Sequence, residues 1–212
     1  NAQLYSAIQD ANRAKSDFVS MVSHELKTPM TSIKGYTDLI AAGAVGPVTE
    51  TQSDFLGTIR SNVDRMQTLV SDLADTARIE AGRLRLDFRA VAMNEIVHEV
   101  VRTTKAQFEA KTQTLEIDVP DGLPKVWGDR DRLTQILANL VSNAHKYSPE
   151  EGQAFITAEE RKNEWQPGGA ERVVHVAVRD TGFGISPENQ KNIFQKFFRA
   201  DDEEIRTSPG TG

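Results

Sequence analysis

The residues best suited to chemistry stand close together near the start of the chain, in the stretch 18–29 (FVSMVSHELKTP). His24 carries an imidazole, which is a nucleophile in its neutral form. Glu25 beside it can accept a proton, although adjacent residues on a helix do not face each other. Thr28 and Pro29 follow one turn later. Since most surface histidines are merely solvated, the pair has a chemical meaning only if the chain supplies something for His24 to react with.

A second group of polar residues lies on one face of a helix predicted around residue 140. Asn139 and Asn143 are four residues apart, and Lys146 lies one turn beyond Asn143. Asparagine carbonyls are neutral oxygen ligands suited to a Mg²⁺ ion that also keeps water and nucleotide phosphate oxygens, and lysine offers a charge for a phosphate. The alternative is that both asparagines are solvated or form hydrogen bonds at the helix end.

Three further stretches are candidates for ligand binding. Residues 180–185 (DTGFGI) follow a predicted strand, and their glycines let the backbone approach a ligand while Asp180 accepts a hydrogen bond from an amino group, but a plain turn has the same pattern. Residues 193–199 (IFQKFFR) form an aromatic patch that is by itself more typical of core packing. Residues 208–212 (SPGTG) are of the glycine-rich kind that can wrap phosphates.

Composition narrows the function classes. A formal net charge of -6 argues against nucleic acid as the main ligand, because a surface that tracks phosphates normally has a basic excess. The 212 residues include no cysteine, so neither disulfides nor thiolate metal sites hold the fold. No apolar run approaches the ~20 residues that span a bilayer, and no signal peptide is visible. We therefore expect a soluble segment cut from a longer protein.

The elements that must position these residues begin with a helical hairpin. Apolar residues recur at three- and four-residue steps over residues 1–42, which predicts one helix with a kink at Pro29. Residues 43–47 (GAVGP) break it, and a second helix, capped by Thr49 or Thr51, extends to about residue 80.

Gly82 is a plausible stop for that second helix. A lone hairpin leaves much of its apolar stripe exposed, so we expect two copies to form a dimeric four-helix bundle. The alternative is that the stripe packs on the downstream domain.

Strands mixed with helices follow from about residue 83, which predicts a separate α+β domain. We expect a helix capped by Asn94 and another capped by Asp129. The predicted strands cover residues 84–88, 114–119, 154–158 and 173–179.

The order and spacing of the five motifs closely resemble those of the sensor histidine kinases of two-component signalling. Residues 18–29 resemble that family's H box, NLVSNAHKY its N box and DTGFGI its G1 box, while IFQKFFR resembles the F box and GTG the first half of the G2 box. The resemblance covers essentially the whole chain. It implies an incoming signalling helix (1–16), a dimerisation and histidine phosphotransfer domain (17–82) and a catalytic ATP-binding domain (83–212).

The resemblance also implies roles for the first motif. His24 is expected to accept the phosphoryl group, Glu25 to be its acid/base partner, and Thr28 to position water for dephosphorylating the partner protein. The second domain is expected to be a Bergerat-type α+β sandwich of the gyrase, chaperone, kinase and mismatch-repair ATPase superfamily. Because the chain ends inside the G2 box, we expect that sandwich to be incomplete at its C-terminus.

The cofactors implied are ATP and Mg²⁺. Asn143 and Asn139 are expected to engage Mg²⁺, Asp180 the adenine amino group and Arg199 the γ-phosphate. The full set carried over by motif position is Asn139, Asn143, Lys146, Tyr147, Asp180, Gly182, Gly184, Ile185, Phe194, Arg199, Gly210, Thr211 and Gly212. The other three histidines, His98, His145 and His175, match no acceptor position and are expected to be structural or solvated.

The function implied is autophosphorylation of His24 by ATP and transfer to an aspartate of a response regulator, together with phosphatase activity toward that regulator. The expected partners are a second copy of the chain, the regulator's receiver domain and an upstream sensor domain. We expect the cytoplasmic portion of a protein that is either membrane-anchored or soluble. One rival is another ATPase of the same superfamily, against which the H box argues; the other is a non-catalytic dimeric scaffold.

Overall fold

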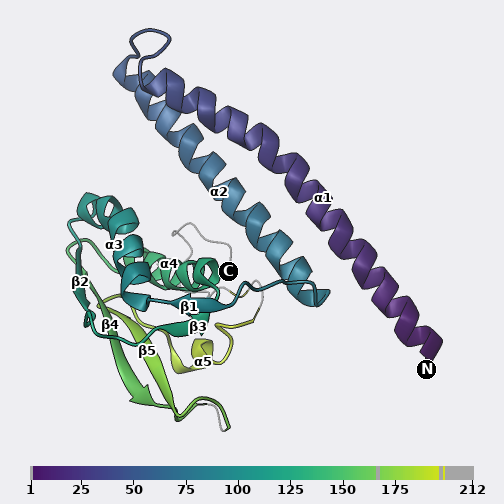
Figure 1. The fold of residues 1–212 in the computed structure, drawn as a ribbon. Coiled ribbons are helices and arrows are strands. Elements are labelled where there is room, and N and C mark those ends of the chain that lie inside the picture. The colour runs from purple at the N-terminus through teal and green to yellow at the C-terminus, as the bar shows by residue number, and fades with distance from the viewer. Residues whose placement is uncertain (1, 166–167, 196–197, 199–212) are drawn as a thin grey trace. The chain divides into compact units, whose positions relative to one another are not determined.

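The computed structural model describes residues 2–165, 168–195 and 198, and for residues 2–11 the backbone alone. The chain separates into two compact units, with the division between Arg85 and Leu86. The regular elements of the first unit are both helices, and the second unit combines strands and helices (Figure 1). The domain boundaries after residues 16 and 82, which the sequence motifs suggested, stay predictions.

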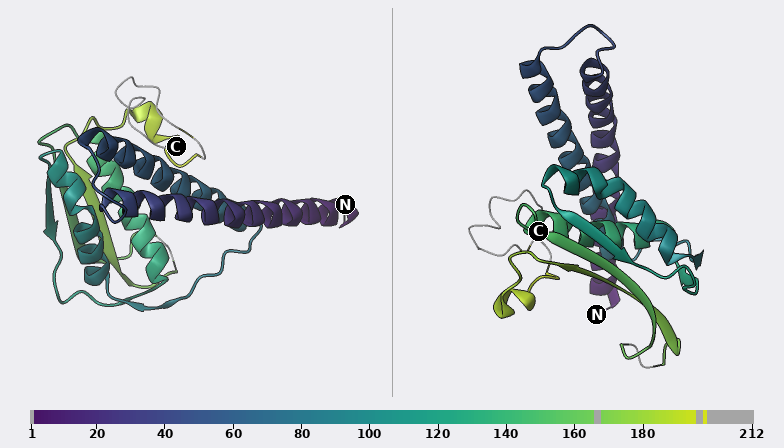
Figure 2. Two further views of the ribbon diagram at one scale, coloured as in Figure 1. Left: turned by 90° about the horizontal axis from the view of Figure 1, so that it is seen from above. Right: turned by 90° about the vertical axis from the view of Figure 1, so that its left-hand side faces the viewer.

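The first unit is the helical hairpin predicted from the sequence. Helix α1 spans Ala2–Ala41 and α2 spans Glu50–Glu80. The two helices lie side by side and antiparallel (Figures 1 and 2). Helix α1 remains helical through Pro29, whose ring removes the N–H that would otherwise bond to the carbonyl of Glu25.

Both ends of α2 carry the predicted stop and start signals. Thr49 accepts a hydrogen bond from the N–H of Gln52 (3.3 Å), and the Gln52 side chain accepts one from the N–H of Thr49 (2.8 Å), which is a capping box. At the other end Gly82 adopts φ +65°, and the next N–H, that of Arg83, donates to the carbonyl of Arg78 (2.8 Å). Glycine is favoured at this left-handed position because it has no Cβ.

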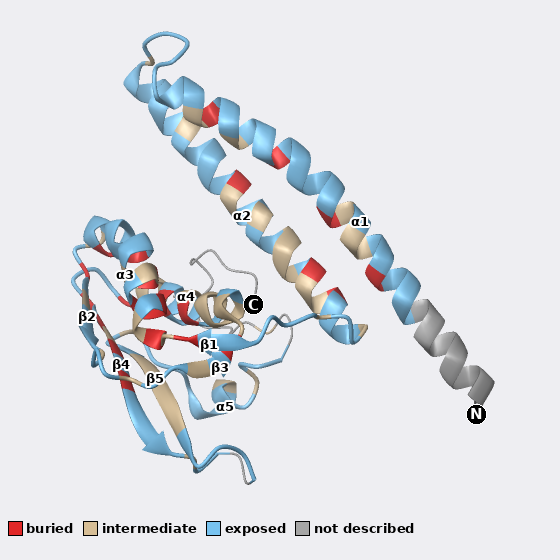
Figure 3. Ribbon diagram, in the orientation of Figure 1, coloured by how far each residue is buried: buried red, intermediate tan, exposed pale blue. Residues whose placement is uncertain are grey.

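The seam between α1 and α2 is lined mostly by small or polar side chains. On α1 the buried residues recur every seventh position, and Figure 3 shows them in red along the helix: Ser16, Ser23, Met30 and Thr37. On α2 the buried residues are Val63, Ala74 and Ala77. The large apolar side chains of the predicted stripe are instead exposed in the single chain, among them Phe18, Ile33, Tyr36, Phe55, Ile59, Met66 and Leu73.

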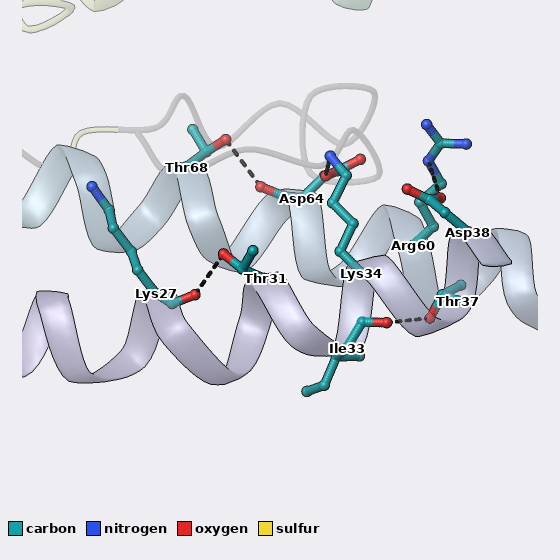
Figure 4. A network of polar contacts seen from close by, with 9 residues as sticks. All are labelled: Lys27, Thr31, Ile33, Lys34, Thr37, Asp38, Arg60, Asp64 and Thr68. Atoms are coloured by element: carbon teal, nitrogen blue, oxygen red, sulfur yellow. Dashed lines mark hydrogen bonds and ion pairs between the residues drawn. The ribbon is translucent and has the colours of Figure 1, made fainter.

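Ion pairs join the two helices toward the hairpin loop. Lys34 Nζ lies 2.6 Å from Asp64 Oδ1, and Arg60 Nε lies 3.4 Å from Asp38 Oδ1 (Figure 4). Near the open end, Lys15 pairs with Glu80 and Arg83 pairs with Asp17. Because such partly exposed pairs add little stability, their main effect is to keep the two helices in one register.

The second unit is built from two small sheets and two long helices. Its elements, in chain order, are β1 (Arg89–Val91), α3 (Met93–Ala110), β2 (Thr114–Asp118), β3 (Val126–Gly128), α4 (Arg130–Tyr147), β4 (Gln153–Lys162), β5 (Arg172–Asp180) and α5 (Pro187–Gln190). Strand β1 pairs antiparallel with β3, and the other sheet has the order β2-β4-β5. Strand β2 runs parallel to β4, which runs antiparallel to β5.

Helices α3 and α4 pack on the three-stranded sheet and enclose the core. Helix α3 contributes Ile96, Val97, Val100 and Phe108, helix α4 contributes Leu137, Val141 and Ala144, and β4 contributes Ala154 and Ile156. The two-layer α+β arrangement predicted from the sequence is therefore confirmed.

Two local predictions were wrong. Residues 84–88 alternate like a strand, but pairing begins only at Arg89, and the N–H of Asp87 donates to Asp129 Oδ2 (2.8 Å). Helix α3 is capped by Ala92, while Asn94 lies inside its first turn. In the first case the local pattern was outweighed by the position of the partner strand.

Candidate functional site

His24 lies on the exposed side of α1. The side chains of His24 and Glu25 are 82% and 78% exposed, and His24 Nδ1 lies 3.7 Å from Glu25 Oε1. That separation is longer than a hydrogen bond, so a further small side-chain rotation would close it. The sequential neighbours thus approach each other despite their different helical directions, and the carboxylate lies near one specific ring nitrogen.

Ser23 fixes the direction of His24. Its hydroxyl is buried in the seam, donates to the carbonyl of Val19 (2.7 Å) and lies 3.5 Å from the carbonyl of Val70 on α2. Because successive helical residues are about 100° apart, a buried Ser23 directs its neighbour toward solvent. Thr28 is exposed one turn later, with its hydroxyl 3.5 Å from the carbonyl of His24.

The asparagine pair occupies the solvent-facing side of α4. Asn139 and Asn143 are both exposed, and Lys146 Nζ lies 5.3 Å from the centre of the Tyr147 ring. The helix begins at the predicted cap, Asp129, which accepts a hydrogen bond from the N–H of Arg132 (3.1 Å). Backbone N–H donors, above all that of Asp87, hold the pKa of Asp129 below its usual value.

The glycine-rich loop after β5 is packed directly against the end of α4. The N–H of Phe183 donates to the carbonyl of Tyr147 (3.1 Å). A Cβ at position 182 would lie only 2.3 Å from that carbonyl oxygen, so this approach requires glycine at Gly182. Gly184 has φ +74°, a conformation that favours glycine. The second and third sequence motifs therefore meet in space.

Asp180 is held at the end of β5 by its own turn. Its Oδ1 accepts a hydrogen bond from the N–H of Gly182 (2.9 Å). Thr181 ties the same turn to β4, since its N–H donates to the carbonyl of Gln153 (3.0 Å) and its hydroxyl accepts from the N–H of Gln153 (2.9 Å). The carboxylate is exposed and oriented, as a group that reads an amino substituent must be.

The remaining predicted residues are less closely joined to this group. Ile185 is exposed, and its carbonyl accepts a hydrogen bond from Gln190 of α5 (2.8 Å). Phe194 follows α5 and is 95% exposed. The other predicted nucleotide residues, Arg199, Gly210, Thr211 and Gly212, lie outside the described residues.

Gln113 is a residue that the sequence motifs did not point to. It is only 6% exposed, and its amide nitrogen donates to the carbonyl of His145 at the end of α4 (3.1 Å). Its Oε1 lies 2.6 Å from Nδ1 of His145. Burial, followed by the charge of Lys111, lowers the pKa of His145. A glutamine in a helix-to-strand turn has no sequence signature, so only the fold shows this contact.

The other two histidines make ordinary structural contacts. His98 Nδ1 lies 2.7 Å from the carbonyl of Asn94, one turn earlier in α3. The ring of His175 stacks on that of Trp165, with centroids 5.2 Å apart. Neither contact resembles the exposed pair at His24 and Glu25.

Two family models match the chain, and they match its two units separately. Residues 14–82 match the His Kinase A (phospho-acceptor) domain. Residues 128–212 match the histidine kinase-, DNA gyrase B- and HSP90-like ATPase domain. The chain belongs to the sensor histidine kinases of two-component signalling.

Curated relatives match nearly the whole chain. The signal transduction histidine-protein kinase BarA of Escherichia coli is 35% identical over 208 residues, which are 96% of this chain and 22% of BarA. The non-motile and phage-resistance protein of Caulobacter vibrioides is 32% identical over 205 residues, 96% of this chain and 24% of that protein. The chain thus spans about a quarter of the length of these curated relatives.

A solved structure has a similar fold. The crystal structure of full-length ShkA in complex with AMPPNP is 27% identical, with a TM-score of 0.66, and the match covers 89% of this chain and 38% of ShkA. Within the described residues, no helix of this histidine kinase is long and apolar enough to cross a membrane.

Proposed function

We propose that this chain is the kinase core of a two-component sensor, in which ATP phosphorylates His24 and the phosphoryl group then passes to an aspartate of a response regulator. The observation that carries the proposal is the presence in one chain of an exposed histidine–carboxylate pair on a helical hairpin and of a glycine-requiring loop packed against an asparagine-bearing helix. Membership of the histidine kinase family supports both halves of the reaction.

Phosphoryl transfer needs positioning and charge neutralisation more than covalent help from the protein. Nε2 of His24 attacks the γ-phosphorus, a P–N bond forms, and the bond from phosphorus to the bridging oxygen breaks so that ADP leaves with that oxygen. Glu25 lies on the Nδ1 side of His24 and takes up the proton of Nδ1 as this attack makes the ring positive. Exposure of His24 suits a residue that must meet two partners in turn.

The residues on the second unit fit a magnesium nucleotide. Asn139 and Asn143 offer amide oxygens on one exposed face, and Lys146 lies on the same helix one turn on. The absence of a Cβ at Gly182 lets the loop approach the end of α4 closely. We propose that Asp180 on this loop and Asn143 on α4 serve one ligand. We assign Mg²⁺ to Asn143 and Asn139, and adenine to Asp180, with Tyr147, Gly184, Ile185 and Phe194 around the nucleotide.

The kinase proposal is tested with the purified protein, γ-labelled ATP and Mg²⁺. Wild type should become labelled, and Asn143→Asp should abolish labelling because a carboxylate repels the phosphates and alters metal binding. Asn94→Asp is the matched control, since Asn94 lies in the same unit but in the first turn of α3. Labelling of Asn143→Asp at the wild-type rate would show that Asn143 has no part in the reaction.

Thr28 supports a second activity of the same site, dephosphorylation of the regulator. Its exposed hydroxyl lies one turn from His24, where it can orient water against a phospho-aspartate. Thr28→Ala should slow regulator dephosphorylation while leaving autophosphorylation intact. Thr31→Ala is the control. Thr31 lies three residues after Thr28, and its hydroxyl is engaged with the carbonyl of Lys27 (2.9 Å). An unchanged rate of regulator dephosphorylation by Thr28→Ala would show that Thr28 does not position the water.

The hairpin also supports a dimer as the working form. Most of its large apolar side chains are exposed in the single chain, while mainly small or polar residues fill the seam between α1 and α2. Burying such side chains contributes roughly 1.5–3 kcal/mol each, so a second hairpin is the natural cover. We further propose that residues 1–16 lead in from a sensor domain and that residues 17–82 receive the regulator.

A further inference from the structure

Two chain reversals of the second unit are joined around Gln113. One leads from α3 into β2, and the other leads from α4 into β4. The N–H of Thr114 donates to the carbonyl of Gly152 (3.0 Å), and the N–H of Glu151 donates to the carbonyl of Lys111 (3.2 Å). Gln113 lies between these two backbone bonds, so its side chain is enclosed by both reversals.

The Gln113 amide is the hydrogen-bond donor to the end of α4. Its Nε2 lies 3.1 Å from the carbonyl of His145, 2.9 Å from that of Ser148 and 2.8 Å from that of Pro149. The last carbonyls of a helix have no partner within the helix, and burying them without one would be destabilising. Gln113 thus closes the helix that carries Asn139 and Asn143.

His145 holds the Gln113 amide in the orientation that this requires. The Oε1 of Gln113 can only accept, so the His145 nitrogen 2.6 Å away, Nδ1, carries the proton. The His145 ring also packs against Phe108 of α3, with centroids 5.1 Å apart. Lys111 adds a further donor to the carbonyl of His145 (3.4 Å). We refer to Gln113 and His145 together as the clamp.

The same turn of α4 contacts the glycine-rich loop on its other side. The carbonyl of Tyr147, two residues after His145, accepts the hydrogen bond from the N–H of Phe183, and its oxygen is the atom that a Cβ at position 182 would meet most closely. Gly182 in turn donates to Asp180. A continuous set of bonds and close contacts therefore leads from Gln113 through the end of α4 to Asp180.

We infer that Gln113, oriented by His145, is a positioning residue that sets the separation between Asn143 on α4 and Asp180 on the loop. The inference rests on the proposed nucleotide site. If the clamp opens, the end of α4 and the loop move apart. A nucleotide held by Asn143 then no longer lies at hydrogen-bonding distance from Asp180. Affinity should fall, and so should the preference for adenine over guanine, because Asp180 is the group that distinguishes the two bases.

Gln113→Leu tests this by keeping the volume and removing the donor. The Kd for ATP should rise about tenfold, which corresponds to one or two lost hydrogen bonds, and the ratio of GTP to ATP dissociation constants should fall toward one. Ile156→Val, a core change on β4, is the matched control: it should lower stability while leaving both constants unchanged. His145→Asn, whose amide N–H replaces Nδ1–H, should behave as wild type, whereas His145→Leu should behave as Gln113→Leu.

A second measurement reads the position of the loop without nucleotide. In Gln113→Leu, hydrogen exchange of the Phe183 amide, held by Tyr147, should become faster, while that of the Thr181 amide, held by Gln153, should not change. If Gln113→Leu does not fold, His145→Leu carries the same comparison. Failure of wild type to bind ATP would overturn the proposed function. The exchange data would still show whether Gln113 and His145 position the loop. Unchanged Phe183 exchange, or equal acceleration at both amides, would overturn the inference.

Discussion

At the scale of single residues, Gly182 decides whether two motifs about 35 positions apart in the sequence can meet. A Cβ there would lie 2.3 Å from the carbonyl oxygen of Tyr147 and 2.7 Å from Asp180 Oδ1. Gly182→Ala should therefore push the loop away from α4, lower stability by about 1–3 kcal/mol and weaken ATP binding more than about tenfold.

The measurements for Gly182→Ala are a urea unfolding curve and an ATP titration. Gly122→Ala is the control, because nothing lies within 4 Å of a Cβ at that position. Normal ATP affinity in Gly182→Ala would mean that the loop does not need its close approach to α4.

His145 makes the stability of the second unit depend on pH. Its pKa in the folded protein is below the ordinary 6.5, chiefly because of burial, so the unfolded chain binds more protons as the pH falls through that value. Stability should hence decline below about pH 6.5 and be unaffected by this group above it. His145→Asn should remove that part of the decline in urea midpoints. A decline of the same size in wild type and His145→Asn would contradict this.

At the scale of elements, signals carried by neighbouring residues predicted the structure well. The hairpin, the cap at Thr49, the stop at Gly82 and the cap at Asp129 follow from residues within one turn of each other. Residues 84–88 failed because a strand needs a partner, and the partner of β1 is β3, about 40 residues away. Pattern alone also could not say that small side chains would line the α1–α2 seam.

In the candidate site, too, residues with a local sequence signal could be predicted and residues that act through tertiary contacts could not. Asn139, Asn143, Asp180 and Gly182 could be chosen from type and spacing, because each belongs to a recognisable local motif. Gln113 could not be chosen, since its importance comes from carbonyls more than 30 residues away. The close approach of Gly182 to Tyr147 likewise depends on tertiary structure, so the sequence alone could not predict it.

The capping box at Thr49 gives a prediction for α2 as a whole. Thr49→Ala removes the acceptor for the N–H of Gln52 and should lower the stability of the hairpin by about 1 kcal/mol, read from the urea midpoint. Thr51→Ala, in the first turn of the same helix, should have a smaller effect. Equal effects of the two substitutions would show that the box contributes no more than ordinary helix propensity.

At the scale of the whole molecule, the exposed apolar side chains of the hairpin predict association. Ile33→Glu places a charge in the surface that a second copy is proposed to cover, and a dimer would bury that charge twice. The purified variant should sediment as a monomer at concentrations where wild type is a dimer. Ile117→Glu, an exposed apolar position on β2, should leave the dimer intact. A dimeric Ile33→Glu would place the contact elsewhere.

The most direct test is to locate the phosphoryl group after incubation with ATP and Mg²⁺. Wild type should carry one acid-labile, base-stable label, and mass spectrometry should place it on His24. His24→Gln should carry none, while His98→Gln and His175→Gln should be labelled like wild type. A label of the same chemistry on His24→Gln would contradict the account.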